Sequence, residues 1–158
     1  IFGKPRRLVT DAVILAYKAI RKNHYGEPIK FVLMNTAANR NKDINEPISV
    51  VEKLFMVIIR LLLPPQADNE NAADFLRTDI GQNNNLVHWV IVRPDTLINE
   101  DEVTEYELFA SPIRSALSNP GKTSRINVGD FMARLVVETD LWMKWKGQMH
   151  VIYNIERK

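Results

Sequence analysis

A short apolar stretch that ends abruptly at a proline constrains the fold of this chain more than any other feature. Residues 87–92 are rich in β-branched and aromatic side chains, and Arg93 and Pro94 follow them directly. Such a run is typical of a buried strand. Because proline cannot donate to a neighbouring strand, we expect the strand to end at Pro94. Ligands of open α/β sheets bind beyond the carboxyl ends of strands, so the loop that begins at Arg93 is the predicted site.

The other apolar patterns alternate between those of helices and those of strands. Helical spacing and end signals predict four helices, over about residues 10–23, 48–63, 68–80 and 128–138. Continuous apolar runs predict strands at residues 30–35, 87–92 and 149–153, and a shorter one at 106–110. This alternation predicts an α/β fold with a doubly wound parallel sheet. A length of 158 residues suits one domain or a large part of one.

The predicted helix over residues 48–63 is apolar around most of its circumference. Leu54 lies on one apolar face, and Val57 and Leu61 lie on another. A helix that buries only one side needs an apolar stripe of roughly 100°. We therefore expect this helix to be buried in the domain or in a partner interface. The segment is too short and, with Arg60, too charged to span a bilayer, and no membrane partner is expected.

Composition argues against several functional classes. The chain has no cysteine, so it can form no disulfide, thiolate metal site or cysteine nucleophile, which fits a cytoplasmic protein. The formal net charge is only +2 and the basic residues are dispersed, so we expect no nucleic-acid partner. His24, His88 and His150 lie far apart, with no histidine or carboxylate at metal-ligand spacing, and no metal site is expected.

Four segments carry a resemblance to a known family. They read KFVLMNT at residues 30–36, AADFLR at 72–77, WVIVRP at 89–94 and SRINVGDFM at 124–132. In order and spacing they resemble the C-terminal half of the atypical short-chain dehydrogenase/reductases, which are NAD(P)-binding proteins. The resemblance implies that residues 1–158 form the C-terminal portion of one Rossmann-like domain. It also implies NAD(P)-dependent oxidoreductase or isomerase chemistry on an unidentified small molecule.

The resemblance places candidate site residues at the ends of two strands. Thr36 matches the position of the family's catalytic Ser or Thr, where its hydroxyl could hydrogen-bond a substrate carbonyl. The segment that starts at Arg93 matches the loop that holds the nicotinamide end of NAD or NADP through its backbone. The cofactor-binding candidates are therefore Asn35, Thr36, Arg93, Pro94, Asp95 and Thr96. Polar residues also end strands for reasons of turn formation alone, so an ordinary strand terminus remains the alternative.

Two parts of the family pattern have no counterpart in the sequence. The six glycines are scattered, and none forms the glycine-rich loop that seats the pyrophosphate on a helix N-terminus. The family's Tyr and Lys align near Gln66 and Glu70, and an amide cannot serve as a general acid. We expect a fragment of a larger NAD(P)-binding protein, since half a doubly wound sheet would leave a bare edge. The alternative is a protein that has lost that half and with it most of its cofactor affinity. An enzyme and a non-catalytic NAD(P)-sensing regulator both remain open, as does a homodimer through the helix at 48–63.

Overall fold

The computed structural model describes residues 6–23, 26–46, 50–115 and 118–155. The chain forms two compact units, and each is described by itself. The first consists of Ile1–Ile29 and Pro47–His88, and the second consists of Lys30–Glu46 and Trp89–Lys158. The expectation that the two form part of one dinucleotide-binding domain stays a prediction.

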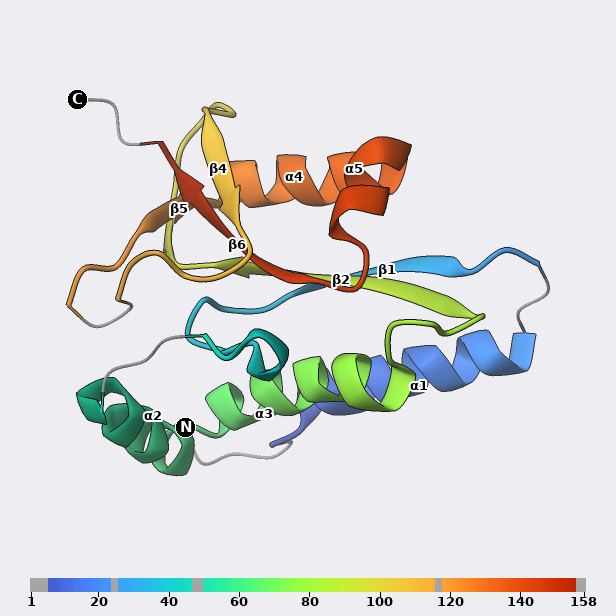
Figure 1. Cartoon of the computed structure of the whole chain (residues 1–158), viewed down its shortest axis with the longest axis horizontal. Helices are drawn as coiled ribbons and strands as arrows, with labels where there is room; N and C mark the ends of the chain where they lie inside the picture. The colour runs from blue at the N-terminus through green and yellow to red at the C-terminus, as the bar shows by residue number, and fades with distance from the viewer. Residues whose placement is uncertain (1–5, 24–25, 47–49, 116–117, 156–158) are drawn as a thin grey trace. The chain divides into compact units, whose positions relative to one another are not determined.

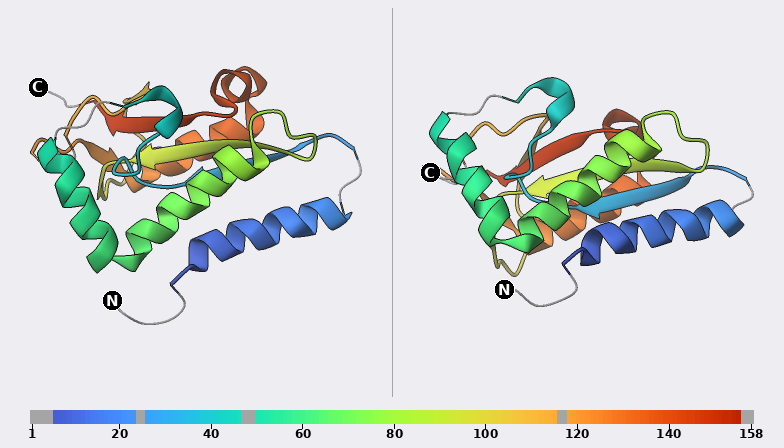
Figure 2. Two further views of the ribbon diagram at one scale, coloured as in Figure 1. Left: turned by 60° about the horizontal axis from the view of Figure 1, so that its bottom comes forward. Right: turned by 90° about the horizontal axis from the view of Figure 1, so that it is seen from below.

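The first unit is helical. Its helices are α1 (Leu8–Asn23), α2 (Val50–Leu62) and α3 (Pro64–Asp74), and α3 continues as a π-helical segment over Phe75–Ile80. Proline is well suited to the first turn of a helix, so Pro64 separates α2 from α3. Gly81 adopts a φ of 74° and ends the helical segment, as the sequence predicts. Helices α1 and α3 lie side by side (Figure 2).

A four-stranded sheet has the order β1-β2-β6-β4 (Figure 1). Its strands are β1 (Ile29–Met34), β2 (Val87–Pro94), β4 (Tyr106–Phe109) and β6 (Met149–Asn154). Strand β2 runs parallel to β6. Backbone hydrogen bonds link β1 and the residues after it to β2. Later residues of the first segment bond to later residues of the second, so β1 runs parallel to β2 as well. Strand β2, which contains the apolar stretch over residues 87–92, therefore lies between β1 and β6. It ends at Pro94 as expected.

Two features of the sheets differ from the expectation of one wholly parallel sheet. Strand β4 pairs antiparallel with β6, as edge strands of otherwise parallel sheets often do. In addition, β3 (Thr96–Ile98) and β5 (Lys122–Ser124) form a separate parallel pair. Strands of three residues are too short to show a periodic pattern, which explains why the sequence did not predict them.

Helices α4 (Arg125–Val137) and α5 (Thr139–Trp145) cover one face of the sheet (Figure 1). The core beneath them is formed by buried side chains of β2, β6 and both helices: Val90, Val92, Val128, Phe131, Leu135, Trp142, Trp145 and Ile152. His150 belongs to the same layer, with its ring centroid 4.8 Å from Phe131 and 4.7 Å from Trp145. Burial, with a smaller contribution from the charge of Arg93, lowers the pKa of His150 to about 3.

Helix α2 exposes its apolar side chains. The exposed fraction is 46% for Val57 and 75% for Leu61. The apolar residues of α2 that are exposed are Val50, Leu54, Phe55, Val57, Ile58, Leu61 and Leu62. The expected burial of α2 within the domain is therefore not observed among the described residues. Its apolar side chains would be buried only by a partner or by a further segment.

No helix among the described residues combines the length and hydropathy needed to cross a membrane.

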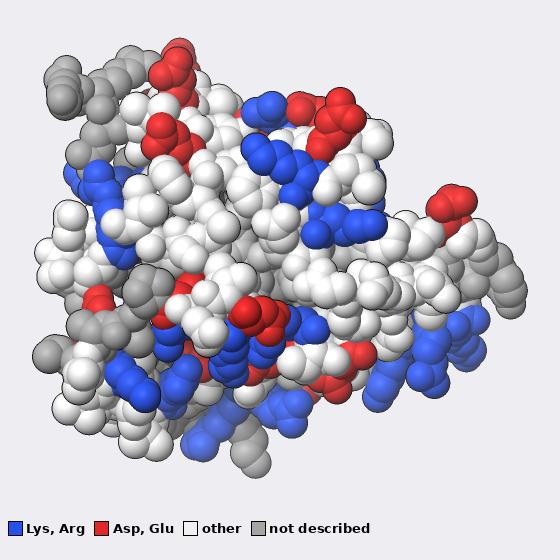
Figure 3. Space-filling model, viewed as in Figure 1, with Lys and Arg blue, Asp and Glu red and all other residues white. Residues whose placement is uncertain are grey.

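On the surface, acidic and basic side chains are interspersed over the face shown in Figure 3. The last turn of α1 carries Arg21 and Lys22.

Candidate functional site

The carboxyl ends of β1 and β2 lie next to each other. The amide of Asn35 donates to the carbonyl of Val92 at 2.8 Å, and the amide of Ala37 donates to the carbonyl of Pro94 at 2.9 Å. The loops that leave the two strands therefore begin side by side at one edge of the sheet. The structure thus brings Asn35 and Thr36 close to the segment that starts at Arg93, at the edge where α/β sheets bind ligands.

The hydroxyl of Thr36 accepts a hydrogen bond but keeps its own hydrogen. Its Oγ1 accepts from the amide of Ala38 at 3.3 Å, and its carbonyl accepts from the amide of Asn39 at 3.0 Å. The amide of Thr36 donates to Oδ1 of Asn35 at 2.9 Å. Within the described part of the chain, no protein group accepts the hydroxyl hydrogen of Thr36. A half-buried hydroxyl fixed as an acceptor in this way can donate to a ligand.

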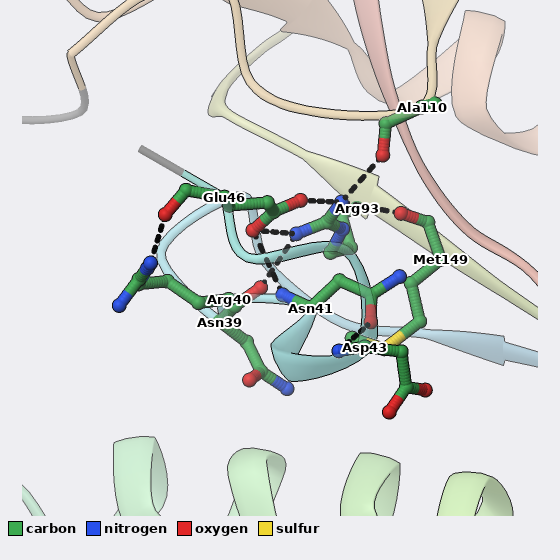
Figure 4. Close-up of polar contacts among 8 residues, drawn as sticks. All are labelled: Asn39, Arg40, Asn41, Asp43, Glu46, Arg93, Ala110 and Met149. Atoms are coloured by element: carbon green, nitrogen blue, oxygen red, sulfur yellow. Dashed lines mark hydrogen bonds and ion pairs between the residues drawn. The ribbon is translucent and has the colours of Figure 1, made fainter. Parts of the chain in front are cut away.

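The side chain of Arg93 is fully buried and is bonded through both terminal nitrogens (Figure 4). Nη1 donates to Oε2 of Glu46 at 3.0 Å and to the carbonyl of Asn39 at 2.8 Å. Nη2 donates to Oε1 of Glu46 at 2.5 Å and to the carbonyls of Ala110 and Met149. Buried charges depend on such pairing. Both terminal nitrogens of the guanidinium are thus occupied by protein groups, and contact of the Arg93 backbone with a cofactor stays a prediction.

Glu46 organises the loop that follows β1. Its Oε2 accepts from the amide of Asn41 at 2.8 Å, and its carbonyl accepts from the side chain of Arg40. Oδ1 of Asn41 accepts from the amide of Asp43 at 3.0 Å and caps a short 3-10 turn. The turn ends at Asn45 in the left-handed conformation, with a φ of 47°. No sequence pattern pointed to Glu46, an isolated acid in a polar loop.

Asp95, which directly follows β2, is hydrogen-bonded to Gly121. Oδ2 of Asp95 accepts from the amide of Gly121 at 2.9 Å, and the amide of Thr96 donates to the carbonyl of Gly121 at 3.1 Å. Burial raises the pKa of Asp95, against the hydrogen bonds from Gly121 and Thr96 and the charge of Arg114. The predicted residues Asp95 and Thr96 are therefore tied into the fold. Their contact with a cofactor stays a prediction.

The positions that align with the family's Tyr and Lys hold a polar cluster of the first unit. Nε2 of Gln66 donates to Oε1 of Glu70 at 3.1 Å, and Nε of Arg60 lies 2.6 Å from Oε2 of Glu70. The side chain of Glu70 is buried, and both of its oxygens are engaged. This cluster contains neither a phenol nor an amine, so the proton donation and pKa lowering of the family's dyad have no equivalent in it.

Metal ligands do not gather in the part of the chain that the structure describes. No group of three or more His, Asp or Glu side chains lies close enough there to hold an ion. Both ring nitrogens of His150 face apolar or aromatic neighbours and have no hydrogen-bond partner among the described residues.

Solved structures show what this fold is similar to. A short-chain dehydrogenase/reductase of Veillonella parvula, solved in complex with NADP, is 19% identical, and the match covers 95% of this chain and 60% of that one with a TM-score of 0.56. For a provisionally assigned NAD-dependent epimerase/dehydratase of Bacillus halodurans the identity is 17%, the coverage 94% and 53%, and the TM-score 0.58. A provisionally assigned NADH-flavin reductase of Streptococcus pneumoniae is 14% identical, with coverage of 98% and 69% and a TM-score of 0.60.

These likenesses establish the fold. The chain has a Rossmann-like fold, as the sequence predicts. It spans 60% of the length of the Veillonella parvula protein and 53% of the length of the Bacillus halodurans protein. No protein-family model matches the chain, and no curated protein matches it significantly.

Proposed function

We propose that this chain, given its Rossmann-like fold, is the nicotinamide- and substrate-facing portion of an NAD(P)-dependent oxidoreductase or isomerase. The observation that carries the proposal is the arrangement at the carboxyl edge of the sheet. There the ends of β1 and β2 are hydrogen-bonded to each other, and the Thr36 hydroxyl retains a hydrogen that it can donate. This is the edge at which α/β sheets bind ligands.

In this proposal, Thr36 hydrogen-bonds the carbonyl oxygen of the substrate. A donor aimed at an oxygen that gains negative charge stabilises the transition state more than the ground state. The amide of Ala38 donates to the Thr36 oxygen, so the hydroxyl hydrogen stays available for a bond to the substrate. Bound NAD(P)H would supply the hydride, and Asn35 and the Arg93–Thr96 backbone would position the nicotinamide end.

The cofactor of the proposal is NAD or NADP. The described residues include no glycine-rich turn leading into a helix N-terminus, which is the usual seat of the pyrophosphate. Most of the affinity for the dinucleotide is therefore assigned to sequence outside this chain. We expect this chain alone to bind NADH and NADPH weakly or not at all.

A second candidate function rests on the cluster of Gln66, Glu70 and Arg60. Because Gln66 is an amide and Glu70 is bonded on both oxygens, the two positions that align with the family's Tyr and Lys offer no equivalent of that dyad. The same fold could then serve a non-catalytic regulator that senses NAD(P). Such a protein would bind the dinucleotide and turn nothing over.

Fluorescence titration and a turnover screen together test the proposal. The full-length protein and this chain alone are each titrated with NADH and NADPH, and the full-length protein is then offered aldehydes, ketones and flavins. Micromolar binding and oxidation of the cofactor by the full-length protein are expected. Binding without turnover would favour the regulator, and failure of the full-length protein to bind either dinucleotide would refute both. Micromolar binding by this chain alone would refute the assignment of the affinity to other sequence.

We further propose that α2 forms a homodimer interface. Its exposed apolar residues lie on one broad side of the helix, and contiguous apolar patches of this kind mark association surfaces in soluble proteins. A cover supplied by sequence outside this chain is the alternative, and the two are separated by a substitution argued in the Discussion.

A further inference from the structure

A short series of hydrogen bonds connects Arg93 to Thr36. Nη1 of Arg93 donates to the carbonyl of Asn39 at 2.8 Å. The amide of Asn39 donates to the carbonyl of Thr36 at 3.0 Å, and its side-chain amide donates to Oδ1 of Asn35 at 3.3 Å. Oδ1 of Asn35 also accepts from the amide of Thr36 at 2.9 Å. The guanidinium therefore contacts the turn that presents the Thr36 hydroxyl through a single intervening residue.

Two separate parts of the loop over residues 35–46 are bonded to Arg93. Asn39 ties the first part of the loop to Nη1, and Glu46 ties the last residue of the loop to both terminal nitrogens (Figure 4). The Glu46 carboxylate also holds the amide of Asn41 at 2.8 Å. The exposed fractions of the Arg93 and Glu46 side chains are 0% and 1%, so water does not compete for these bonds. Arg93 and Glu46 together thus hold residues 39, 41 and 46 of the loop at one buried point.

We propose that Arg93 and Glu46 are positioning residues, whose ion pair holds the 35–46 loop in the conformation that presents the Thr36 hydroxyl to the substrate. This inference rests on the proposed function of Thr36. A buried ion pair is often no more stabilising than apolar side chains of similar volume, so stability alone does not call for one here. Its directional bonds do distinguish one loop conformation from others, which apolar packing would not.

The test replaces both charges at once in the full-length protein. A single substitution would leave a buried charge without its partner and could unfold the protein, whereas Arg93→Met with Glu46→Met removes both. Arg93→Lys is the second variant, because it keeps the charge opposite Glu46 but loses the planar fork that serves four acceptor groups. A double change of the exposed pair Arg7 and Asp11, to Gln and Asn, is the matched control. Circular dichroism verifies folding of each variant.

The first readout is hydrogen exchange, which does not depend on turnover. Peptides that cover residues 35–46 should exchange at least about tenfold faster in the Arg93→Met/Glu46→Met protein, whereas peptides of α1 should not change. The control protein should match the wild type over residues 35–46. Arg93→Lys should show an intermediate rate in the loop.

The second readout is a comparison of kcat in two backgrounds. Removing the pair should lower kcat about tenfold and leave the Kd for NAD(P)H within about twofold. In a Thr36→Val background the same removal should change kcat by less than about twofold, because residues that act through one group are not additive. A merely structural pair would lower kcat by the same factor in both backgrounds.

Three outcomes would overturn the inference. Unchanged exchange over residues 35–46 would show that the pair does not hold the loop. Faster exchange with unchanged kcat, or equal losses of kcat in both backgrounds, would show that it does not act through Thr36. If the full-length protein binds no dinucleotide, the proposed function fails separately, and the exchange measurement still decides whether Arg93 and Glu46 fix the loop.

Discussion

Asp68 caps the N-terminus of α1 through Thr10, a residue 58 positions earlier in the chain. Oδ1 of Asp68 accepts from the amide of Thr10 at 2.9 Å and from its hydroxyl at 2.6 Å. Oδ2 accepts from the amide of Val9 at 2.8 Å. The first amides of a helix have no partner within it and carry partial positive charge, so a buried carboxylate suits them. This single residue of α3 therefore fixes where α1 begins.

Asp68→Asn should lower the free energy of unfolding by roughly 1–2 kcal/mol, because the amide keeps the size but loses the charge opposite the helix end. Burial acts to raise the pKa of Asp68, but the hydrogen bonds from Thr10 and Val9 lower it on balance. A lowered pKa in the folded state stabilises the protein above the pKa of an unfolded aspartate. This contribution is lost as the pH falls through the lowered value. Urea unfolding of wild type and variant at neutral and acid pH measures both effects.

The matched control is Asp74→Asn in the same helix. Asp74 pairs with Arg77 at 3.0 Å, and its side chain is one-third exposed. Such a pair contributes less than about 1 kcal/mol, so the control should unfold close to wild type. A loss for Asp74→Asn equal to that for Asp68→Asn would show that the cap has no special weight.

His150 should make the protein less stable as the medium is acidified. The pKa of His150 is lowered from 6.5 to about 3 by burial and, to a smaller extent, by the charge of Arg93. The unfolded chain therefore takes up a proton below pH 6.5 that the folded protein does not, and stability falls as the pH decreases from 6.5 to about 3. Between pH 7 and pH 5 this amounts to about 2 kcal/mol.

His150→Phe removes the titrating group and keeps an aromatic ring beside Phe131 and Trp145. The variant can differ from wild type in absolute stability, because its ring is larger. The quantity to compare is the change in unfolding free energy between pH 7 and pH 5. It should be about 2 kcal/mol smaller in the variant. An unchanged difference would mean that His150 is protonated in the folded protein.

Local patterns in the sequence predicted most of the elements, and one strand end in particular. Apolar runs located β1, β2 and β6, and Pro94 fixed the end of β2 because its chemistry excludes a further sheet bond. The helices at the start and near the end of the chain, α1 and α4, were predicted from helical spacing and end signals. Asn35 and Thr36 became candidates through the resemblance, which places the family's Ser or Thr at the end of this strand.

What could not be predicted depends on partners distant in sequence. Glu46 meets Arg93 across 47 positions, and neither residue's neighbours indicate the other. The requirement for glycine at position 121 also depends on a residue distant in sequence. A Cβ at Gly121 would lie 2.2 Å from the ring of Tyr153, so the position requires glycine because of a side chain on another strand. The antiparallel direction of β4 was missed for a similar reason, because periodicity indicates a strand but not its neighbour's direction.

Glu substitutions at Val57 and Leu61 test the role of α2 in the full-length protein. If α2 pairs with a second copy, two charges in an apolar interface should weaken the dimer at least about 100-fold and leave a folded monomer. Light scattering gives the mass and circular dichroism gives the helix content. Lys53→Glu, an exposed charged position of the same helix, is the control and should leave the mass unchanged.

The other outcomes of this experiment are equally informative. Unfolding at every protein concentration would indicate that sequence outside this chain covers α2. A folded protein of unchanged mass would contradict both the dimer and the cover, since in either case Val57 and Leu61 would be buried.

Thr36→Val is the substitution that bears most directly on chemistry. Valine keeps the shape of threonine but removes the hydroxyl, so kcat of the full-length protein should fall about 100-fold if that hydroxyl stabilises a developing oxyanion. The Kd for NADH or NADPH should stay within about twofold, because the proposed bond is to the substrate. The amide of Ala38 loses its acceptor as well, which should cost about 1 kcal/mol of stability. Stopped-flow turnover, cofactor titration and urea unfolding measure the three effects separately.

Thr36→Ser separates the hydroxyl from the shape of the side chain. Serine retains an oxygen that can accept from Ala38 and a hydrogen to donate, so it should restore kcat to within about tenfold of wild type. Equal loss of kcat and of cofactor affinity in Thr36→Val would identify Thr36 as a binding or structural residue. Failure of Thr36→Ser to recover activity while stability recovers would show that the threonine methyl group, and not the hydroxyl, is what the site requires.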